Sequence, residues 1–374
     1  MARGSIIRRE GKRGAVYAIR YYADGKQHWE TIGPRKKEAD AALAERLRQI
    51  SRGEFRSLKD CPFTELCDKF LAIKKSQIRP RTYESYEARV KQIKAYFGSA
   101  NVRNITEEHV EKFVASLSNS NHAPETRAKT VTLLKAIFEA GVRWGYLGIS
   151  PARFVKRPKA PKREAEFLKP DEIKLLIDTV DPRHRPLIMF LCLTGCRISE
   201  ALGLRWSDVD FNSGRIFIRQ VLQASKHDDR RFFSPKTDAS RRAIDLPDIL
   251  IQELKTQQAW LTVELESNEY DLVFPNSAGK PAHYRNLALR VLEPALRRAG
   301  IRRVGFHSLR HSYVSMLAAQ GENLKTVQAL VGHSSARTTW DTYSHVFDGE
   351  TKKAVSRLEE RLFGANAKTD VLLE

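Results

Sequence analysis

HSLRHSYVSM, residues 307–316, places His307 and His311 four positions apart, so on a helix the two side chains share one face. This is the spacing of a zinc-binding helix, but a zinc protease would carry Glu directly after the first histidine, and position 308 is Ser. Arg310 follows His307 by three positions and faces the same way. A planar guanidinium group binds phosphate and repels cations. The stretch therefore predicts a phosphate site rather than a metal site.

The composition indicates where such a phosphate would come from. The 374 residues include 65 Lys and Arg against 45 Asp and Glu, a net charge of +20. This excess predicts a polyanionic partner, most simply nucleic acid, with a basic solvated surface as the alternative. The length predicts two or three domains, and the 41% hydrophobic content predicts globular ones.

The cysteines and the hydropathy of the chain indicate the cellular compartment in which the protein works. The four cysteines form no Cys-x-x-Cys pair, which predicts a reduced protein with buried thiols. No signal peptide and no apolar run of transmembrane length is evident. We therefore expect a cytoplasmic, nucleoid-associated protein with no membrane partner.

Residues 1–57 predict a small sheet followed by a helix. Two strand-like runs flank Asp24-Gly25, a strong hairpin signal, and SIIRRE before them is a candidate third strand. The run RKKEADAALAERLRQI predicts an amphipathic helix. Such a sheet can enter a DNA groove, and a small stabilising cap is the alternative. The side chains that we expect to be exposed on the sheet are Arg20, Tyr22, Lys26, His28 and Glu30, and we expect the first three to contact DNA.

Residues 58–155 predict four amphipathic helices, with Thr106 as the N-terminal cap of the third. Basic residues lie at helix starts and on polar faces, where phosphates bind well, although each one alone also fits an ordinary solvated face. Together they favour a DNA clamp. The expected contacts are Arg79, Arg81, Arg89, Lys129 and Lys135. Residues 156–167, rich in Pro, Lys and Arg, predict an exposed linker.

Residues 168–374 predict a mixed domain. Helices come first, then a β segment near residues 214–246, then helices to about residue 363 and a frayed end. The fold class is therefore mixed and mainly α: an α+β domain with a small β-sheet, an all-α domain, and a small N-terminal three-stranded sheet with one helix.

Four further residues of this domain carry potential chemistry. Arg197 lies in the apolar, helix-like run LCLTGCRISEALGLRWSDVD, and a buried arginine needs a partner, for which Glu200 is placed; a purely structural ion pair is the alternative. Lys236 lies between two strand-like runs, at or near a hairpin, and on its own would be an ordinary solvated lysine. Tyr343, by default a half-exposed packing residue, would become an oxygen nucleophile beside such cations, because they lower the pKa of its phenol.

Together these motifs resemble the tyrosine recombinase (phage integrase) family. TGCRISE, PKTDASRR, HSLRH, Val331-Gly332-His333 and TTWDTYSHV occur in the family's order and supply its two arginines, lysine, two histidines and tyrosine. The one departure is Val331, where Leu is commoner. The resemblance is strong over residues 165–363, weaker for the helical core-binding (SAM-like) domain, and a matter of pattern alone for an arm-binding domain at residues 1–57.

The resemblance implies a role for each residue. Tyr343 attacks a DNA phosphate to give a 3′-phosphotyrosine, Arg197 and Arg310 clamp the non-bridging oxygens, and Lys236 protonates the leaving 5′-oxygen. His307 accepts the tyrosine proton and His333 hydrogen-bonds the phosphate. Glu200 and His311 support the site. No metal, ATP or other cofactor is expected.

The implied partners are double-stranded DNA attachment sites, three further copies of the chain in a homotetramer on DNA, and accessory DNA-bending or directionality proteins. A tail helix with an apolar stripe, Val355, Leu358 and Leu362, would pack on a neighbouring protomer or on its own. A mobile-element integrase is the preferred function. The alternatives are an Xer-type resolvase, a DNA-relaxing enzyme like type IB topoisomerases, and a DNA-binding relic without activity.

Overall fold

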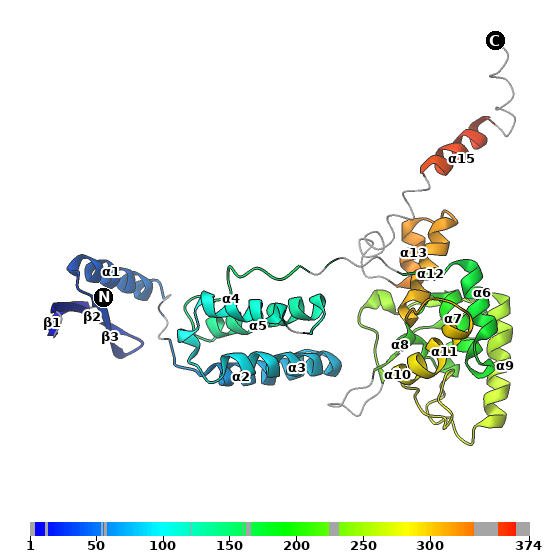
Figure 1. The fold of residues 1–374 in the computed structure, drawn as a ribbon, viewed down its shortest axis with the longest axis horizontal. Helices are drawn as coiled ribbons and strands as arrows, with labels where there is room; N and C mark the ends of the chain where they lie inside the picture. The colour runs from blue at the N-terminus through cyan, green and yellow to red at the C-terminus, as the bar shows by residue number, and fades with distance from the viewer. Residues whose placement is uncertain are drawn as a thin grey trace, which may run out of the picture. The chain divides into compact units, whose positions relative to one another are not determined.

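The computed structural model describes residues 4–11, 14–53, 55, 58–119, 121–159, 161, 166–223, 232–332 and 351–363. The chain divides into two compact units, Met1–Pro161 and Lys162–Glu374, each with its own hydrophobic core (Figure 1). None of the helices among these residues is both long and apolar enough to cross a membrane.

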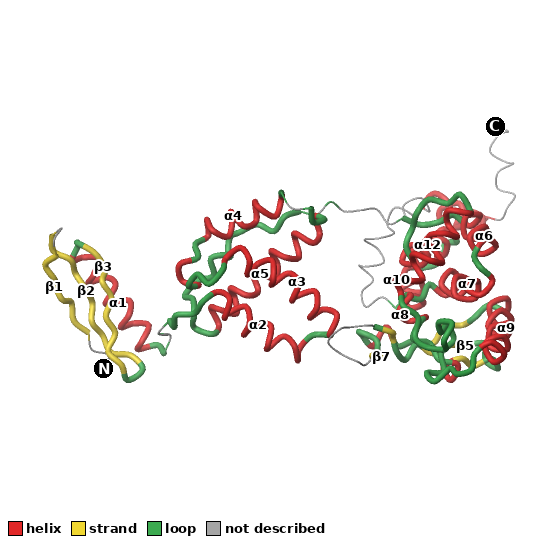
Figure 2. The backbone as a smooth tube through the Cα atoms, turned by 60° about the horizontal axis from the view of Figure 1, so that its bottom comes forward, coloured by secondary structure: helices red, strands yellow, loops and turns green. Residues whose placement is uncertain are grey.

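The first unit begins with a three-stranded antiparallel sheet in the order β1-β2-β3, as the sequence predicted (Figure 2). The elements are β1 (Gly4–Gly11), β2 (Gly14–Ala23), β3 (Lys26–Gly33) and α1 (Lys36–Ser51). Asp24 and Gly25 both have positive φ, 50° and 71°, the backbone that a two-residue hairpin turn requires. Helix α1 contacts all three strands. Its buried Ala39 packs with Ile19, Tyr21 and Ala23 of β2 in a small core.

Four helices complete the first unit, and all four were predicted. They are α2 (Phe63–Gln77), α3 (Pro80–Phe97), α4 (Glu107–Ser118) and α5 (Pro124–Arg143), with a 3₁₀ turn η1 (Val102–Asn104). Helix α5 contacts the other three around one core. Thr106 caps α4 as expected, because its side chain accepts from the His109 backbone N–H at 3.4 Å. The all-α part of the predicted fold class is confirmed.

The second unit is mixed, as predicted. Its helices before the β segment are α6 (Pro170–Thr179), α7 (Arg185–Thr194) and α8 (Ile198–Ala201), with 3₁₀ turns η2 (Pro182–His184) and η3 (Trp206–Asp208). The helices after it are α9 (Asp248–Glu264), α10 (Tyr284–Leu287), π-helical η5 (Ala288–Leu292), α11 (Glu293–Arg298), α12 (Phe306–Ala319), α13 (Leu324–Val331) and α15 (Thr351–Phe363).

The β segment of this unit forms two small antiparallel sheets rather than one. Strands β4 (Val209–Asp210), β5 (Arg215–Phe217) and β8 (Ala243–Asp245) form a three-stranded sheet in that order. Strands β6 (Val221–Leu222) and β7 (Phe232–Phe233) form a two-stranded one, and the 3₁₀ turn η4 (Asp238–Ser240) follows β7. The chain between β7 and β8 therefore passes from one sheet to the other.

Helix α12 is the central helix of the second unit. It contacts α7 on one side and α13 on another. Ser312, fully buried in α12, accepts a hydrogen bond from the backbone N–H of Leu168 at 2.7 Å and donates one to the Ser308 carbonyl at 2.8 Å. The bond from Leu168 holds the segment before α6 against α12, the helix that carries the HSLRH motif.

Ser312→Ala should lower the free energy of unfolding by about 1–3 kcal/mol, because the buried Leu168 N–H would lose its acceptor. Ser315→Ala is the matched control on the same helix. The Ser315 hydroxyl is also buried but finds no hydrogen-bond partner in the described part of the chain, so its removal should cost little. Urea denaturation of both variants measures the difference, and equal losses would contradict the role given to Ser312.

Candidate active site

The apolar run that contains Arg197 is not one helix, and this part of the sequence prediction was wrong. Helix α7 ends at Thr194, Gly195 adopts a left-handed backbone with φ of 60°, and α8 begins at Ile198 with Arg197 at its N-cap position. A Cβ on Gly195 would lie 2.3 Å from Cδ1 of Tyr313, so the turn requires glycine. Because of this break, Arg197 lies at the start of α8 and not within a continuous helix.

Glu200 holds Arg197 from the buried side, and the expected ion pair is present. The carboxylate accepts from the Arg197 guanidinium at 2.7 Å and from the Arg197 backbone N–H at 3.0 Å. The Glu200 side chain is 1% exposed and that of Arg197 is 35% exposed. Burial alone would raise the pKa of Glu200, but Arg242 and Arg197 hold it below its usual value. Arg197 is therefore fixed at one end and open to solvent at the other.

Arg310 is the largest fully buried side chain of the described residues, at 1% exposure. It donates to the Gly195 carbonyl at 2.8 Å and to the Val331 carbonyl at 2.7 Å. Desolvation, and then the positive charge of Arg197, lower its pKa to about 10, so it remains charged at neutral pH. A guanidinium has five N–H donors, and these two bonds leave others to meet an anion.

Arg242 was missed by the sequence analysis. Together with Arg197, Arg310 and the carboxylate of Glu200 it forms the arginine cluster. Its side chain is 7% exposed. It donates to Glu200 Oε2 at 3.1 Å and to the Leu330 carbonyl at 2.9 Å. The only available signal was its place in SRRAID, two positions before the apolar Ile244 of β8, and a strand pattern does not reveal which partner a basic residue will find.

The two histidines of HSLRH lie next to each other on α12, as predicted. Their ring centroids are 4.6 Å apart with the rings edge to face. Partial desolvation lowers the pKa of His307, and the charges of Arg310 and Arg197 lower it further. Desolvation, His307 and Arg310 together lower the pKa of His311 to about 4. Both rings are therefore neutral at pH 7, and a neutral imidazole can accept a proton.

Lys236 is exposed in the segment that connects β7 to η4. It lies near the β6–β7 hairpin, as expected, but the two strands that flank it belong to different sheets. The next residue, Thr237, closes a turn with Ser240, whose hydroxyl lies 3.0 Å from its own. His333 and Tyr343 lie outside the described residues. Within the described residues, no group of three or more His, Cys, Asp and Glu side chains is placed to hold a metal ion.

The predicted DNA contacts of the N-terminal sheet are divided between its two faces. Arg20 and Tyr22 lie on the face away from α1, where Arg20 pairs in register with Trp29. The Cζ atoms of Arg9 and Arg20 lie 5.1 and 5.6 Å from the centroid of the Trp29 ring. Lys26 pairs with Ala23 and so lies on the other face, at the exposed turn.

The expectation that His28 and Glu30 are exposed was wrong. Both are partly buried toward α1. His28 stacks on Tyr21 with ring centroids 5.4 Å apart, and Glu30 accepts from Arg46 of α1 at 2.9 Å and from the Tyr21 hydroxyl. Alternation along β3 places these two side chains on the same face as Lys26.

The predicted contacts on the helices also differ from one another. Arg81 and Lys129 are exposed, and Lys129 makes a long 3.5 Å ion pair with Glu125. Arg89 is half-buried and donates to the Ser85 carbonyl at 2.8 Å. Lys135 donates to the Val155 carbonyl at 2.9 Å, which ties down the end of the helical region. Arg79 is half-buried at the N-cap position of α3.

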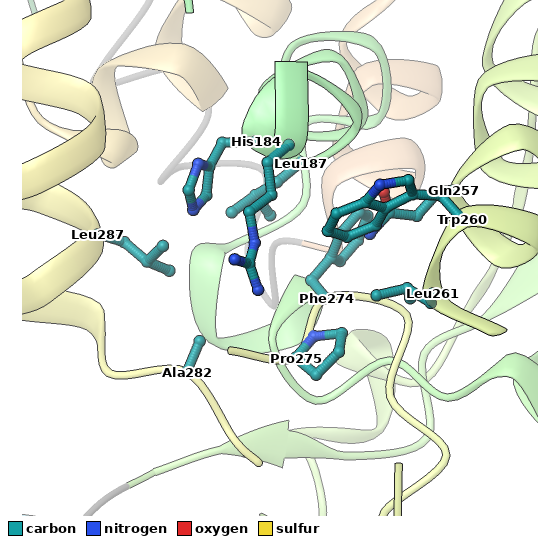
Figure 3. Close-up of a pocket in the computed structure, with 10 residues that line it drawn as sticks. His184, Leu187, Gln257, Trp260, Leu261, Phe274, Pro275, Ala282 and Leu287 are labelled. Carbon is teal, nitrogen blue, oxygen red and sulfur yellow. The ribbon is translucent and has the colours of Figure 1, made fainter. Parts of the chain in front are cut away.

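A separate hollow in the second unit contains none of the predicted site residues. Its lining includes His184, Trp260 and Phe274 (Figure 3). The Arg183 guanidinium lies over the Trp260 ring, with Cζ 5.3 Å from the centroid. Burial lowers the pKa of His184. Neither the predicted site residues nor the residues of the arginine cluster line this hollow. We therefore take the arginine cluster, and not the hollow, as the candidate active site.

Comparison with known proteins supplies the family. Residues 166–350 match the Phage integrase family, and residues 62–118 match the phage integrase N-terminal SAM-like domain. The tyrosine recombinase of Thermosipho africanus (strain TCF52B) is 31% identical over 288 residues, which span 74% of this chain and 93% of that protein. The chain belongs to the tyrosine recombinase family.

Other relatives agree with this placement. The ICEBs1 integrase of Bacillus subtilis (strain 168) is 25% identical to this recombinase over 342 residues, or 88% of this chain and 92% of that protein. The fold resembles the Tn1549 transposon integrase in complex with a circular intermediate DNA, with a TM-score of 0.68, 18% identity, and coverage of 80% of this chain and 99% of that one. It also resembles lambda integrase, in a tetramer bound to a Holliday junction, with a TM-score of 0.58, 16% identity, and coverage of 86% and 91%.

The folded recombinase should lose stability as the pH falls from 6.5 to about 4, because the lowered pKa of His311 lets the unfolded chain bind a proton that the folded chain does not. His311→Asn should flatten this dependence. Urea denaturation at pH 7, 5.5 and 4.5 measures it, with exposed His122→Asn as the control that keeps the wild-type slope. An unchanged slope in His311→Asn would contradict the assignment.

Proposed function

We propose that this recombinase cuts and rejoins DNA with Tyr343 as the nucleophile, through a 3′-phosphotyrosine intermediate. The observation that carries the proposal is the arginine cluster. Arg310 is anchored to two backbone carbonyls and Arg197 to a buried carboxylate, so both guanidinium groups are held before any substrate binds. Preorganised donors of this kind stabilise the charge that develops on a phosphate in the transition state.

In the proposed cleavage step, the Tyr343 oxygen forms a bond to phosphorus while the bond from phosphorus to the 5′-oxygen breaks. His307 accepts the tyrosine proton, and Lys236 donates a proton to the leaving 5′-oxygen. Arg197, Arg310 and His333 bind the non-bridging oxygens. Glu200 and His311 support them from behind. The lowered pKa of His307 favours its role, because a neutral ring is ready to accept.

Rejoining is the reverse of cleavage with a different 5′-hydroxyl. The phosphotyrosine keeps the energy of the phosphodiester bond, so the exchange needs no ATP. The positive charge that a phosphoryl transfer requires comes in this proposal from side chains, namely Arg197, Arg310 and Lys236. A cofactor has no assigned step.

We further propose that the chain uses four regions on DNA: residues 1–57 bind arm-type sites, 58–155 bind the core site, 156–167 link, and 168–374 carry out catalysis. The exposed Tyr22 and the Arg9–Trp29–Arg20 stack suit a groove or phosphate surface. Exchange between two duplexes calls for four protomers, a number that matches the lambda integrase tetramer on its junction. Accessory DNA-bending proteins and a nucleoid location complete the proposal.

The biological role that we propose is integration or excision of a phage or other mobile element. The likeness to the ICEBs1 integrase over 88% of the chain supports it. The three-stranded N-terminal sheet supports it too, because a housekeeping resolvase acting on a single core site has no need of a second DNA-binding module.

Covalent trapping tests the chemistry. The full chain is incubated with sheared DNA from its source organism in EDTA, denatured with SDS, and the attached DNA is sequenced. Adducts at one locus are expected for the wild type. Tyr343→Phe should retain DNA binding and form no adduct, because it lacks the attacking oxygen.

Each other result changes the proposal. An adduct in Tyr343→Phe would move the nucleophile elsewhere. Adducts scattered over the genome would favour the DNA-relaxing alternative. Adducts at a chromosomal site where dimeric chromosomes are resolved, and not at the boundary of a mobile element, would favour a resolvase. If no adduct formed under any condition, the protein would be one that binds DNA without cutting it.

Deletion of residues 1–57 tests the role of the N-terminal region. The deletion should reduce integration between paired sites while cleavage of an isolated core site continues, because no residue of the arginine cluster lies in that region. Adduct yield and joint-molecule yield, measured side by side, separate the two steps. Equal integration by both proteins would reduce the region to a structural cap.

A further inference from the structure

Arg242 joins three parts of the second unit that carry different site residues. Its guanidinium donates to Glu200, which holds Arg197, and to the Leu330 carbonyl at the end of α13. It also lies 3.3 Å from the Ser240 carbonyl, and Ser240 closes the turn that begins next to Lys236. Among the described residues, Arg242 is the side chain that bonds to both Glu200 and α13.

The end of α13 depends on two buried arginines. The last carbonyls of a helix have no partner within the helix. Here Arg242 binds the Leu330 carbonyl and Arg310 binds the Val331 carbonyl. Gly332 then turns the chain with φ of 65°, and a Cβ there would lie 2.9 Å from Arg242 Nη1 and 2.9 Å from the Ala239 carbonyl. The C-terminal turn of α13, up to Gly332, is therefore held by side chains of the cluster.

We propose that Arg242 is a positioning residue for DNA cleavage, which holds Arg197, through Glu200, in register with the end of α13. The inference rests on the proposed function, since it assumes that Arg197 clamps the scissile phosphate. Arg242 itself is buried and acts through Glu200 and the Leu330 carbonyl. Positioning at this level matters because a displacement of about 1 Å costs on the order of 100-fold in rate.

The geometry of Arg242 calls for a guanidinium. Its Nε donates to Leu330 and its Nη2 to Glu200, so one planar fork spans both acceptors. A lysine would keep the charge beside Glu200 but offers a single point of attachment. Methionine keeps much of the length without a charge, and leaves Glu200 paired with Arg197 alone.

The experiment uses the full chain and a duplex that carries the locus recovered by trapping, nicked close to the scissile phosphate so that the cleaved fragment diffuses away. Single-turnover adduct formation and DNA affinity are measured for Arg242→Met, Arg242→Lys and the control Arg185→Met. The control breaks a similar ion pair, Arg185 with Glu253 at 2.6 Å, between α7 and α9 and outside the cluster.

We expect Arg242→Met to bind DNA with wild-type affinity and to cleave on the order of 100-fold more slowly. Arg242→Lys should be intermediate, and Arg185→Met should cleave as the wild type does. Wild-type cleavage by Arg242→Met would overturn the inference and leave the proposed function intact. Absence of adducts from the wild type itself would overturn both.

A second substrate separates positioning of the phosphate clamp from positioning of Lys236. A thiolate leaving group needs no proton, so a sulfur atom in place of the bridging 5′-oxygen should restore cleavage to Lys236→Ala. It should not restore Arg242→Met, because the loss there is in phosphate binding. Rescue by sulfur would overturn the route through Arg197 and place the effect in the Lys236 segment.

Hydrogen exchange on the DNA-free protein tests whether Arg242→Met destabilises the whole second unit or only the neighbourhood of Arg242. Arg242→Met should exchange faster at residues 324–332 and around residues 196–201, with the rest of the second unit protected as in the wild type. Faster exchange throughout the unit, together with slow cleavage by Arg242→Lys in proportion to its lost stability, would mean a merely structural role and would refute the inference.

Discussion

A single buried carboxylate, Glu200, balances a group of buried and half-buried arginines. It contacts Arg197 and Arg242 directly, and its negative charge opposes the lowering of the Arg310 pKa. Three positive charges against one negative charge leave an excess of positive charge, and two of the three arginines, Arg242 and Arg310, are shielded from water. Such a cluster costs free energy in the empty protein, and an anion that enters the site removes part of that cost.

The folded chain tolerates the excess charge because backbone oxygens take part in the balance. Arg310 binds two carbonyls and Arg242 binds at least one. Carbonyl dipoles stabilise a cation without cancelling its charge, so the cluster keeps an attractive field for phosphate. A second carboxylate in their place would neutralise the site. The Gly195 turn is necessary for this arrangement, because it presents its carbonyl to Arg310 and directs Arg197 outward from the start of α8.

Much of this fold could be predicted from the sequence, because the signals were local. The Asp24-Gly25 turn, the Thr106 cap and the apolar periodicity of the helices each depend on neighbours in the chain. The Arg197–Glu200 pair was predictable for the same reason, because the partners are three positions apart. Arg242 was not, because its partners Glu200 and Leu330 lie 42 and 88 positions away.

The errors have similar physical causes. The run through Arg197 was predicted as continuous because its apolar content suits a helix, while the break depends on the packing of Tyr313 against Gly195. His28 and Glu30 were assigned to the open face of the sheet because the sequence of an isolated strand does not say which face a helix will cover. Arg46 of α1 and Tyr21 of β2 decide it.

The anchoring of Arg310 also affects how this site can change over generations. Its two acceptors are the main-chain oxygens of Gly195 and Val331, and every amino acid supplies the same oxygen. The side chain at position 331 is buried in the apolar contact between α12 and α13, so the identity of this residue is constrained only by packing. Valine, leucine or isoleucine there presents an identical acceptor to the arginine. Mutational drift at that position can therefore adjust the core of the protein without a change in the chemistry that it supports.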